Sequence, residues 1–402
     1  MKGGCDMLKG NASNHYVPRL ILRKFSDKLC LYNVKTGELH ENIVPEHAYA
    51  IDGLYDAEIE WKLNEKIESQ FGNLLSNVLL KADNEISLTR TQLLIIKKFL
   101  LISVLRTMQS ELFLQREQQL HEKLLFPFEE KQIEGETPFG YWMRTLDVVL
   151  DTNGTPEEIF NHPDKTYPAY RWSRVVNGAY IAFWDAPSKR DEFAITDIGM
   201  TSENENGWDG ICVHNDKKLN WLKDLLDSAT NDAEKSAIAK AIYSTCDFSE
   251  NFMMFPISPR RMIVLICPFY KYRYMSKMEG IKVPELDCLT MIPKENLFEP
   301  NSNKYVLPQT PGKPFNYHEN DRYIYRIKQL TSCEIRYCNA LFMDRIETYL
   351  GFSSLEHVVG SIVKYKKLND PPFVPRVDYT ELYKIIQKRY LGSLNVKMCI
   401  CQ

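Results

Sequence analysis

The chain of 402 residues carries 50 lysine and arginine residues against 53 aspartate and glutamate residues, so its formal charge is −3. Its 44% hydrophobic and 26% charged residues are typical of a globular protein with a large core and exclude a disordered chain. The near-neutral balance argues against a long electrostatic contact with nucleic acid, although a local basic patch remains compatible with it.

The sequence also indicates the cellular location of the protein. The longest apolar run, Leu93 to Leu105, is interrupted by Lys97 and Lys98 and falls short of the roughly 20 residues that span a membrane. The N-terminal segment lacks the apolar region of a secretory signal. The 10 cysteines have no CxxC spacing, which favours reduced thiols. These features predict a cytoplasmic protein without a membrane segment.

The first predicted element is the stretch NHYVPRLILRKFS, residues 14–26. Pro18 is suited to open a helix because its φ is fixed and it needs no donor. His15 then lies just before the positive helix end, which biases its imidazole toward the neutral form of a base or metal ligand. Arg19 falls in the first turn. The alternative is structural: His15 caps the helix and Tyr16 packs against its entry.

Periodicity predicts the elements that follow. Alternating residues on both sides of Lys35-Thr36-Gly37 indicate a hairpin, with glycine supplying the positive φ. Apolar residues three or four apart predict a helix from Asp56 to about Asp83. A second helix is expected from Thr89, a suitable N-cap, to about Lys123.

The second half of the chain adds strand signals. Residues 178–197 predict two strands around a polar turn, and residues 251–268 predict two more around Ser258-Pro259-Arg260. The fold class is therefore α+β, mostly helical with short antiparallel hairpins instead of alternating βαβ units. Further helical patterns cover residues 217–245, 320–350, 355–366 and 380–390. The predicted organisation is a flexible N-terminus (1–13), an α+β domain (14–350) with a helical half (14–160) and a strand-containing half (161–350), and a C-terminal helical extension (351–402).

Five segments in this order resemble the family of proteins of unknown function numbered DUF4238: HYVPRLILRKF, IEWKLNEKIESQFGNLL, FLLISVLRT, EFAITD and FPISPRRMIVL. The family is found mainly in bacteria, its opening reads HYVPxxYLRxF, and the resemblance covers roughly residues 14–350. Thr196-Asp197-Ile198-Gly199 stands where a Ser-Asp-x-Pro turn is usual, and Leu20-Ile21 where an aromatic pair is common. The carboxylate of Asp197 is retained. The resemblance implies kinship and no defined reaction.

Three acidic residues are candidates for chemistry. Glu60 and Glu68 are eight residues apart, about 12 Å along a helix, so they share a face at the border of the apolar stripe. Each would bind an arginine or a shared polar cluster, unless the face is simply solvated. Asp197 ends the apolar strand FAIT, which suits a catalytic or ligand-holding carboxylate and equally an Asx-turn.

Four further polar residues stand in apolar surroundings or at a turn. Arg106 follows LLISVL, and a buried guanidinium without a partner costs several kcal/mol, so we expect it to bind Glu68 on the preceding helix. That pair is either structural or a clamp for a substrate anion. Arg260 and Arg261 are most simply exposed turn residues, with phosphate binding as the alternative. Asn339 would present its amide to the core.

Together these residues predict an enzyme site. His15, Asp197 and Glu68 take catalytic roles, and Arg19, Arg106 and Tyr16 bind the substrate. Glu68 and Asp197 would also hold a metal, for which Mg²⁺ is chemically reasonable. The set fits phosphodiester or nucleotide hydrolysis better than acyl transfer, with a nucleotide or short nucleic acid as partner.

The leading hypothesis is thus a nuclease-like bacterial effector. The alternative is a non-catalytic binding or sensing module in which the same residues form a structural network. Catalysis requires His15 and Asp197 to converge within about 8 Å in a solvent-reachable cleft. The chain lacks GxxxxGK[ST], GxGxxG after a strand, HExxH and GxSxG, so no standard signature decides between the two hypotheses.

Overall fold

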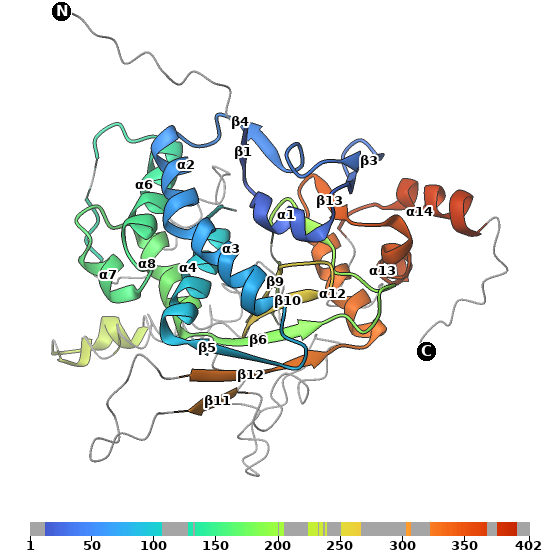
Figure 1. Cartoon of the computed structure of the whole chain (residues 1–402). Helices are drawn as coiled ribbons and strands as arrows, with labels where there is room; N and C mark the ends of the chain where they lie inside the picture. Colours follow the sequence, from blue (N-terminus) through green and yellow to red (C-terminus); the bar gives the residue numbers. More distant parts are fainter. Residues whose placement is uncertain are drawn as a thin grey trace, which may run out of the picture.

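The computed structural model describes residues 13–106, 128–131, 133–199, 201–204, 224–231, 233–235, 238, 251–266, 303–306, 322–367 and 376–391. Figure 1 shows the helices of the first half gathered beside the strands β5, β6 and β12, with the C-terminal helices at the opposite side of the molecule. Within the described residues, no helix is both long and apolar enough to span a membrane.

The first half of the described chain is largely helical, as its apolar spacing predicts. A helical run from Ala57 to Leu79 buries the predicted stripe, and the next helix begins where the hydroxyl of Thr89 accepts the Gln92 N–H at 3.3 Å. The part of this helix predicted beyond residue 106 lies outside the described residues. The helical elements are α1 (Arg19–Phe25), α2 (Ala57–Leu63), η1 (Asn64–Glu68), α3 (Ser69–Leu74), η2 (Leu75–Leu79), α4 (Arg90–Arg106), α6 (Pro138–Asp151), α7 (Pro156–Asn161) and α8 (Tyr167–Gly178).

The described strands form three sheets. The smallest pairs β1 (Ser13–His15) with β4 (Ala50–Asp52). A second has the order β3 (Glu38–Ile43), β2 (Leu29–Asn33), β13 (Tyr349–Phe352) and β7 (Ile195–Thr196). The third has the order β11 (Asn303–Val306), β12 (Arg322–Gln329), β6 (Tyr180–Asp185), β10 (Arg261–Ile266), β9 (Asn251–Pro256) and β8 (Thr201–Asn204), and β5 (Glu85–Thr89) also pairs with β12.

The α+β class is confirmed, and the predicted hairpins are confirmed in part. β2 and β3 pair around Gly37, whose φ is +74°, and β9 pairs with β10. The two strands expected within residues 178–197 do not form a hairpin, because β6 and β7 belong to different sheets. β12 also runs parallel to β6. Long-range pairing therefore shapes the sheets as much as local turns do.

The single helix predicted over residues 320–350 is wrong, because this segment contains β12, α12 (Ser332–Asp344) and β13. Thr331 and Glu334 form a capping box that starts the helix after the strand has ended. The two later helices are confirmed as α13 (Leu355–Lys367) and α14 (Thr380–Ile386), the latter continued by η5 (Gln387–Leu391). The expected flexible N-terminus and most of the helix predicted over residues 217–245 lie outside the described residues.

Asn339 connects three segments inside the core, where it is fully buried. Its Nδ2 atom donates to the Glu192 carbonyl at 2.8 Å and to the Ser361 hydroxyl at 2.9 Å, while its Oδ1 atom accepts the Ala194 N–H at 2.8 Å. The amide predicted to face the core therefore joins α12 to α13 and to the segment before β7.

We expect Asn339→Leu, a substitution of similar size, to lower the free energy of unfolding by about 2–5 kcal/mol, because it leaves the Ala194 N–H and the Glu192 carbonyl buried without a partner. Urea unfolding followed by circular dichroism measures the change. The control is Asn73→Leu on the exposed face of α3. Equal stability of the two variants would refute the role of this amide.

Candidate functional site

His15 is the last residue of β1 and lies three residues before Pro18, the N-cap of α1. Its Nε2 atom is 3.2 Å from the carbonyl oxygen of Glu46, and because a carbonyl only accepts, this nitrogen carries the proton. Burial and the positive charge of Arg19 lower the pKa of the imidazole below 6.5. His15 is therefore a neutral imidazole with Nδ1 unprotonated. Its position before the helix predicts the neutral form, but burial is the main cause.

Arg106, which is 3% exposed, binds the carboxylate that the sequence predicts for it. Its Nη2 atom donates to Oε1 of Glu68 at 2.5 Å. Its guanidinium carbon also lies 6.0 Å from the centre of the Tyr55 ring. The Nε and Nη1 atoms of Arg106 and the hydroxyl of Tyr55 are buried without a hydrogen-bond partner among the described residues. Buried donors normally have partners, so these three groups mark a place that suits an acceptor.

Glu60 lies between the His15 segment and Arg106. Its carboxylate accepts from the Asn14 amide at 3.2 Å and from the Asn64 amide at 3.4 Å. Its negative charge raises the pKa of both His15 and Arg106. Glu60 thus belongs to a shared polar cluster, one of the two arrangements that its sequence position suggests. We name this group the Arg106 cluster; it consists of Asn14, Tyr55, Glu60, Glu68 and Arg106.

Asp197 follows β7 and binds the backbone at the start of β13. Oδ1 accepts the Glu347 N–H at 3.2 Å, and Oδ2 accepts the N–H groups of Tyr349, at 3.2 Å, and of Thr348. Burial raises the pKa of the carboxyl to about 6, although the three hydrogen bonds act in the opposite direction. The Asp197 carboxylate therefore connects the segment after β7 to the backbone at the start of β13.

Tyr16 faces Asp197 instead of the Arg106 cluster. Its ring packs edge to face on Tyr49, with the ring centres 5.9 Å apart, and burial together with the nearby Asp197 raises the pKa of its phenol. Arg19 is exposed on the first turn of α1. Its charge acts on His15 and on Glu46, so Arg19 lies on the His15 side.

The described contacts divide the predicted site residues into two groups. His15 and Arg19 adjoin the Arg106 cluster, which contains Glu68, whereas Tyr16 adjoins Asp197. Successive residues of an extended segment point to opposite sides, which accounts for the separation of the neighbouring His15 and Tyr16. The convergence of His15 and Asp197 in one cleft stays a prediction.

The predicted metal site likewise stays a prediction. Among the described residues, no three His, Cys, Asp or Glu side chains are grouped so that they could hold a metal ion. Glu68 binds Arg106, and Asp197 binds three backbone N–H groups. These two carboxylates already have protein partners of their own.

Arg260 and Arg261 correct the prediction of exposed turn residues. Arg261 is 6% exposed, and its Nε and Nη2 atoms each donate to the Asp185 carboxylate at 2.6 Å. Arg260 donates through Nη2 to the Ala186 carbonyl at 2.5 Å. The hairpin turn lies against the end of β6, where the partly buried Asp185 binds the guanidinium of Arg261.

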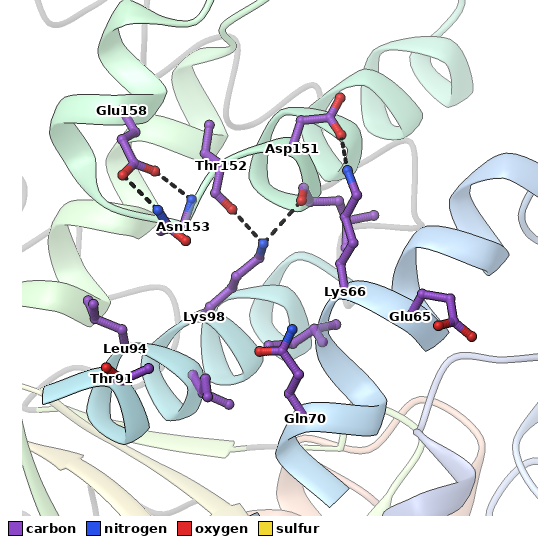
Figure 2. Close-up of a pocket in the computed structure, with 13 residues that line it drawn as sticks. Glu65, Lys66, Gln70, Thr91, Leu94, Lys98, Asp151, Thr152, Asn153 and Glu158 are labelled. Atoms are coloured by element: carbon purple, nitrogen blue, oxygen red, sulfur yellow. Dashed lines mark hydrogen bonds and ion pairs between the residues drawn. The ribbon is translucent and has the colours of Figure 1, made fainter. Parts of the chain in front are cut away.

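A pocket with a volume of about 480 Å³ lies between η1, α3, α4 and the segment that joins α6 to α7. Figure 2 shows Lys98 beside it, with its nitrogen directed at the backbone carbonyl of Thr152, 2.5 Å away. The same nitrogen lies 3.1 Å from the carbonyl oxygen of Leu150. At the rim, Lys66 binds Asp151 at 2.5 Å. Sequence reasoning used Lys98 only to argue against a membrane span; the apolar residues around it were the available signal that its amine is removed from bulk solvent.

A second polar group missed by sequence reasoning lies at the start of α13. Glu192 is 1% exposed and accepts the Ser353 N–H at 2.8 Å. Its other oxygen binds the Ser353 hydroxyl and lies 3.1 Å from Nδ1 of the partly exposed His357. A buried carboxylate that orients an imidazole is also found in acid–base sites, and here it joins the segment before β7 to a helix N-terminus. The acid directly before FAIT was the available signal.

Comparisons with known proteins agree with the resemblance seen in the motifs. The model of the family DUF4238, described as a protein of unknown function, matches residues 13–354. The match covers most of the chain, which therefore belongs to this family. No curated protein and no solved structure matches the chain.

Ionisation of Asp197 is expected to reduce stability. The folded pKa of about 6 lies above the ordinary 3.8, so the stability that protonation contributes is complete below pH 3.8 and is lost as the pH rises through about 6. At about 1.4 kcal/mol per pKa unit, the loss is roughly 3 kcal/mol. Urea unfolding of the wild type and of Asp197→Asn from pH 3.5 to 7 measures it.

Because Asn does not titrate, the difference between the two proteins isolates Asp197 from the other carboxylates. The advantage of the wild type over the variant should shrink as the pH rises. A difference that stays constant, or grows in favour of the wild type, contradicts the raised pKa.

Proposed function

We propose that this DUF4238 member binds a phosphate ester, a nucleotide or a short phosphodiester, at the Arg106 cluster and hydrolyses it. A bacterial origin and a cytoplasmic location are part of the proposal. One observation supports it above all: the Nε and Nη1 atoms of Arg106 and the hydroxyl of Tyr55 are buried donors without a partner among the described residues. Phosphate oxygens are strong acceptors that suit a guanidinium.

The charges around the cluster are compatible with one phosphate group. Glu68 offsets Arg106, and Glu46 is bound to Arg23 at 2.7 Å. The carboxylate of Glu60 accepts hydrogen bonds from the amides of Asn14 and Asn64. With Arg19 exposed beside His15, the basic and acidic side chains nearly cancel, so the donors of Arg106 decide where an anion binds.

His15 supports the hydrolytic part of the proposal. Its imidazole is neutral, and Nδ1 is free of a proton because Nε2 donates to the Glu46 carbonyl. A neutral imidazole next to a carboxylate, here Glu60, can accept a proton from an attacking water molecule. The proposal assigns the proton transfer to His15 and not to Asp197, because Asp197 binds the backbone at the start of β13 and its charge acts on Tyr16.

A second candidate function is a sensing module that binds the same ligand without changing it. The observation in its favour is that Glu68 and Asp197, the two carboxylates for which the sequence predicts catalytic roles, are already bound to Arg106 and to backbone N–H groups. Binding without turnover would separate this candidate from the hydrolase.

The binding step is tested with Tyr55→Phe. Its hydroxyl has no hydrogen-bond partner among the described residues, so its removal should leave folding intact. If that hydroxyl donates to a phosphate oxygen, the affinity should fall roughly 10- to 100-fold, the effect of losing a hydrogen bond to a charged group. Isothermal titration calorimetry with AMP, ADP and a dinucleotide measures the affinity, with adenosine as the ligand that lacks phosphate.

The matched control is Tyr383→Phe on α14, which lies on the opposite side of the molecule from α2 in Figure 1. Equal binding by Tyr55→Phe and the wild type, or equal binding of adenosine and AMP, would reject the phosphate site. His15→Gln then tests the reaction: it should keep the affinity and reduce hydrolysis with or without added Mg²⁺. If the wild-type protein binds the nucleotide but releases no product, the hydrolase is rejected and the sensing module is supported.

A further inference from the structure

Lys97 and Lys98 are neighbours on α4 with nearly the same local chemistry. The Lys97 nitrogen donates to two carbonyls at the end of α8, at 2.5 and 3.2 Å, and the Lys98 nitrogen donates to two carbonyls at the end of α6, at 3.1 and 2.5 Å. Burial lowers the pKa of each to about 8. They differ in that Lys98 lines the pocket of Figure 2 and Lys97 is not among its lining residues.

The hydrogen bonds of Lys98 leave one position of its nitrogen uncommitted. A neutral amine has two N–H groups and one lone pair. In the neutral form, the carbonyls of Leu150 and Thr152 accept the two N–H groups. The lone pair then occupies the third position, which points at neither of these carbonyls. Because Lys98 lines the pocket, a molecule in the pocket can approach the amine from this side.

The neutral amine is present at moderate pH. Burial is the main cause of the lowered pKa of Lys98, and the positive charge of Lys66 contributes, while Glu158 and Asp151 act in the opposite direction. About half of an amine with a pKa of about 8 is neutral at pH 8. A desolvated lysine beside a second cation is a recognised arrangement for a nucleophilic amine.

The pocket lining indicates the class of molecule that fits. The acidic side chains Glu65, Asp151 and Glu158 outnumber Lys66 and Lys98, which disfavours an anion. Neutral polar groups for hydroxyls come from Gln70, Thr91 and Asn153, and an apolar wall comes from Leu94 and Ile95. A small, uncharged and hydroxylated molecule matches this lining.

We propose that Lys98 is the reactive amine of a carbonyl-binding site, which forms a reversible imine with a small, uncharged hydroxyaldehyde or hydroxyketone held in this pocket. The site shares no residue with the Arg106 cluster, so a failure of phosphate binding does not affect this proposal.

The proposed step balances without a cofactor. The lone pair of Lys98 Nζ attacks the carbonyl carbon and forms a C–N bond. The carbonyl oxygen then leaves as water with the two hydrogens that the neutral amine carried. When the imine is protonated it regains one N–H, which the nearby Thr152 carbonyl can accept. No oxidation or reduction occurs.

The test traps the imine in the full-length protein. Glyceraldehyde and sodium cyanoborohydride convert it to a stable secondary amine, and peptide mass mapping locates the modified lysines. We expect Lys98 to be modified roughly tenfold faster than Lys97, since the pocket holds the aldehyde next to one amine and not the other. The rate should rise with pH through about 8, as the neutral fraction of Lys98 increases.

Two variants complete the test. Lys98→Arg retains donors for the carbonyls of α6 and should abolish the adduct. Leu94→Trp changes a side chain that is 42% exposed at the pocket wall, so it should fold normally and slow the modification by obstructing the pocket. Equal labelling of Lys97 and Lys98, or an unchanged rate in Leu94→Trp, would overturn the proposal. Faster labelling by the anionic aldehyde glyoxylate would overturn the assignment of an uncharged ligand.

Discussion

The carboxylate of Asp197 connects parts of the chain that are far apart in sequence. It binds three successive backbone N–H groups at the start of β13 and lies near Tyr16 and Tyr49 from the N-terminal segment. A buried carboxylate needs such donors, because an unsatisfied charge in the interior is costly. The hydroxyl of Tyr49 adds a bond of 3.0 Å to the Ile195 carbonyl. At Gly351 a side chain would collide with that hydroxyl, which explains why glycine occupies the centre of β13.

Buried and partly buried lysines perform a similar task among the helices. The last carbonyls of a helix lack partners within it, and the C-terminal end carries partial negative charge. Lys97 and Lys98 of α4 reach the ends of α8 and α6 and satisfy these carbonyls. Lys62 of α2 binds two carboxylates of α6, Asp147 at 2.5 Å and Asp151 at 3.2 Å. Lys98 therefore has two roles: it connects α4 to the end of α6, and it places an amine at a pocket.

The site was predictable where a single physical rule linked two residues. Arg106 in an apolar helix required a carboxylate, and Glu68 on the preceding helix was the nearest available one in an antiparallel pair. Asp197 shows the limit of such reasoning. A carboxylate at the end of a strand can act in a reaction or bind the backbone of a turn. The backbone that Asp197 binds lies about 150 residues later in the chain, so no local sequence pattern indicates it. The assignment of His15 and Tyr16 to different neighbours arises from the alternation of side chains along an extended segment, which the sequence pattern alone does not connect to a partner.

By itself, the sequence determined the elements whose signals are local: the helical run from Ala57 to Leu79, the β2–β3 hairpin, the helix start at Pro18 and the family of the chain. Periodicity and turn residues act within a few positions, so they can be read without a fold. Only the tertiary structure decided that β6 and β7 enter different sheets, that residues 322–350 begin and end as strands, and that Lys98 lies beside a pocket. Each of these depends on which distant backbone or side chain supplies the missing hydrogen bonds, and a one-dimensional pattern carries no information about that partner.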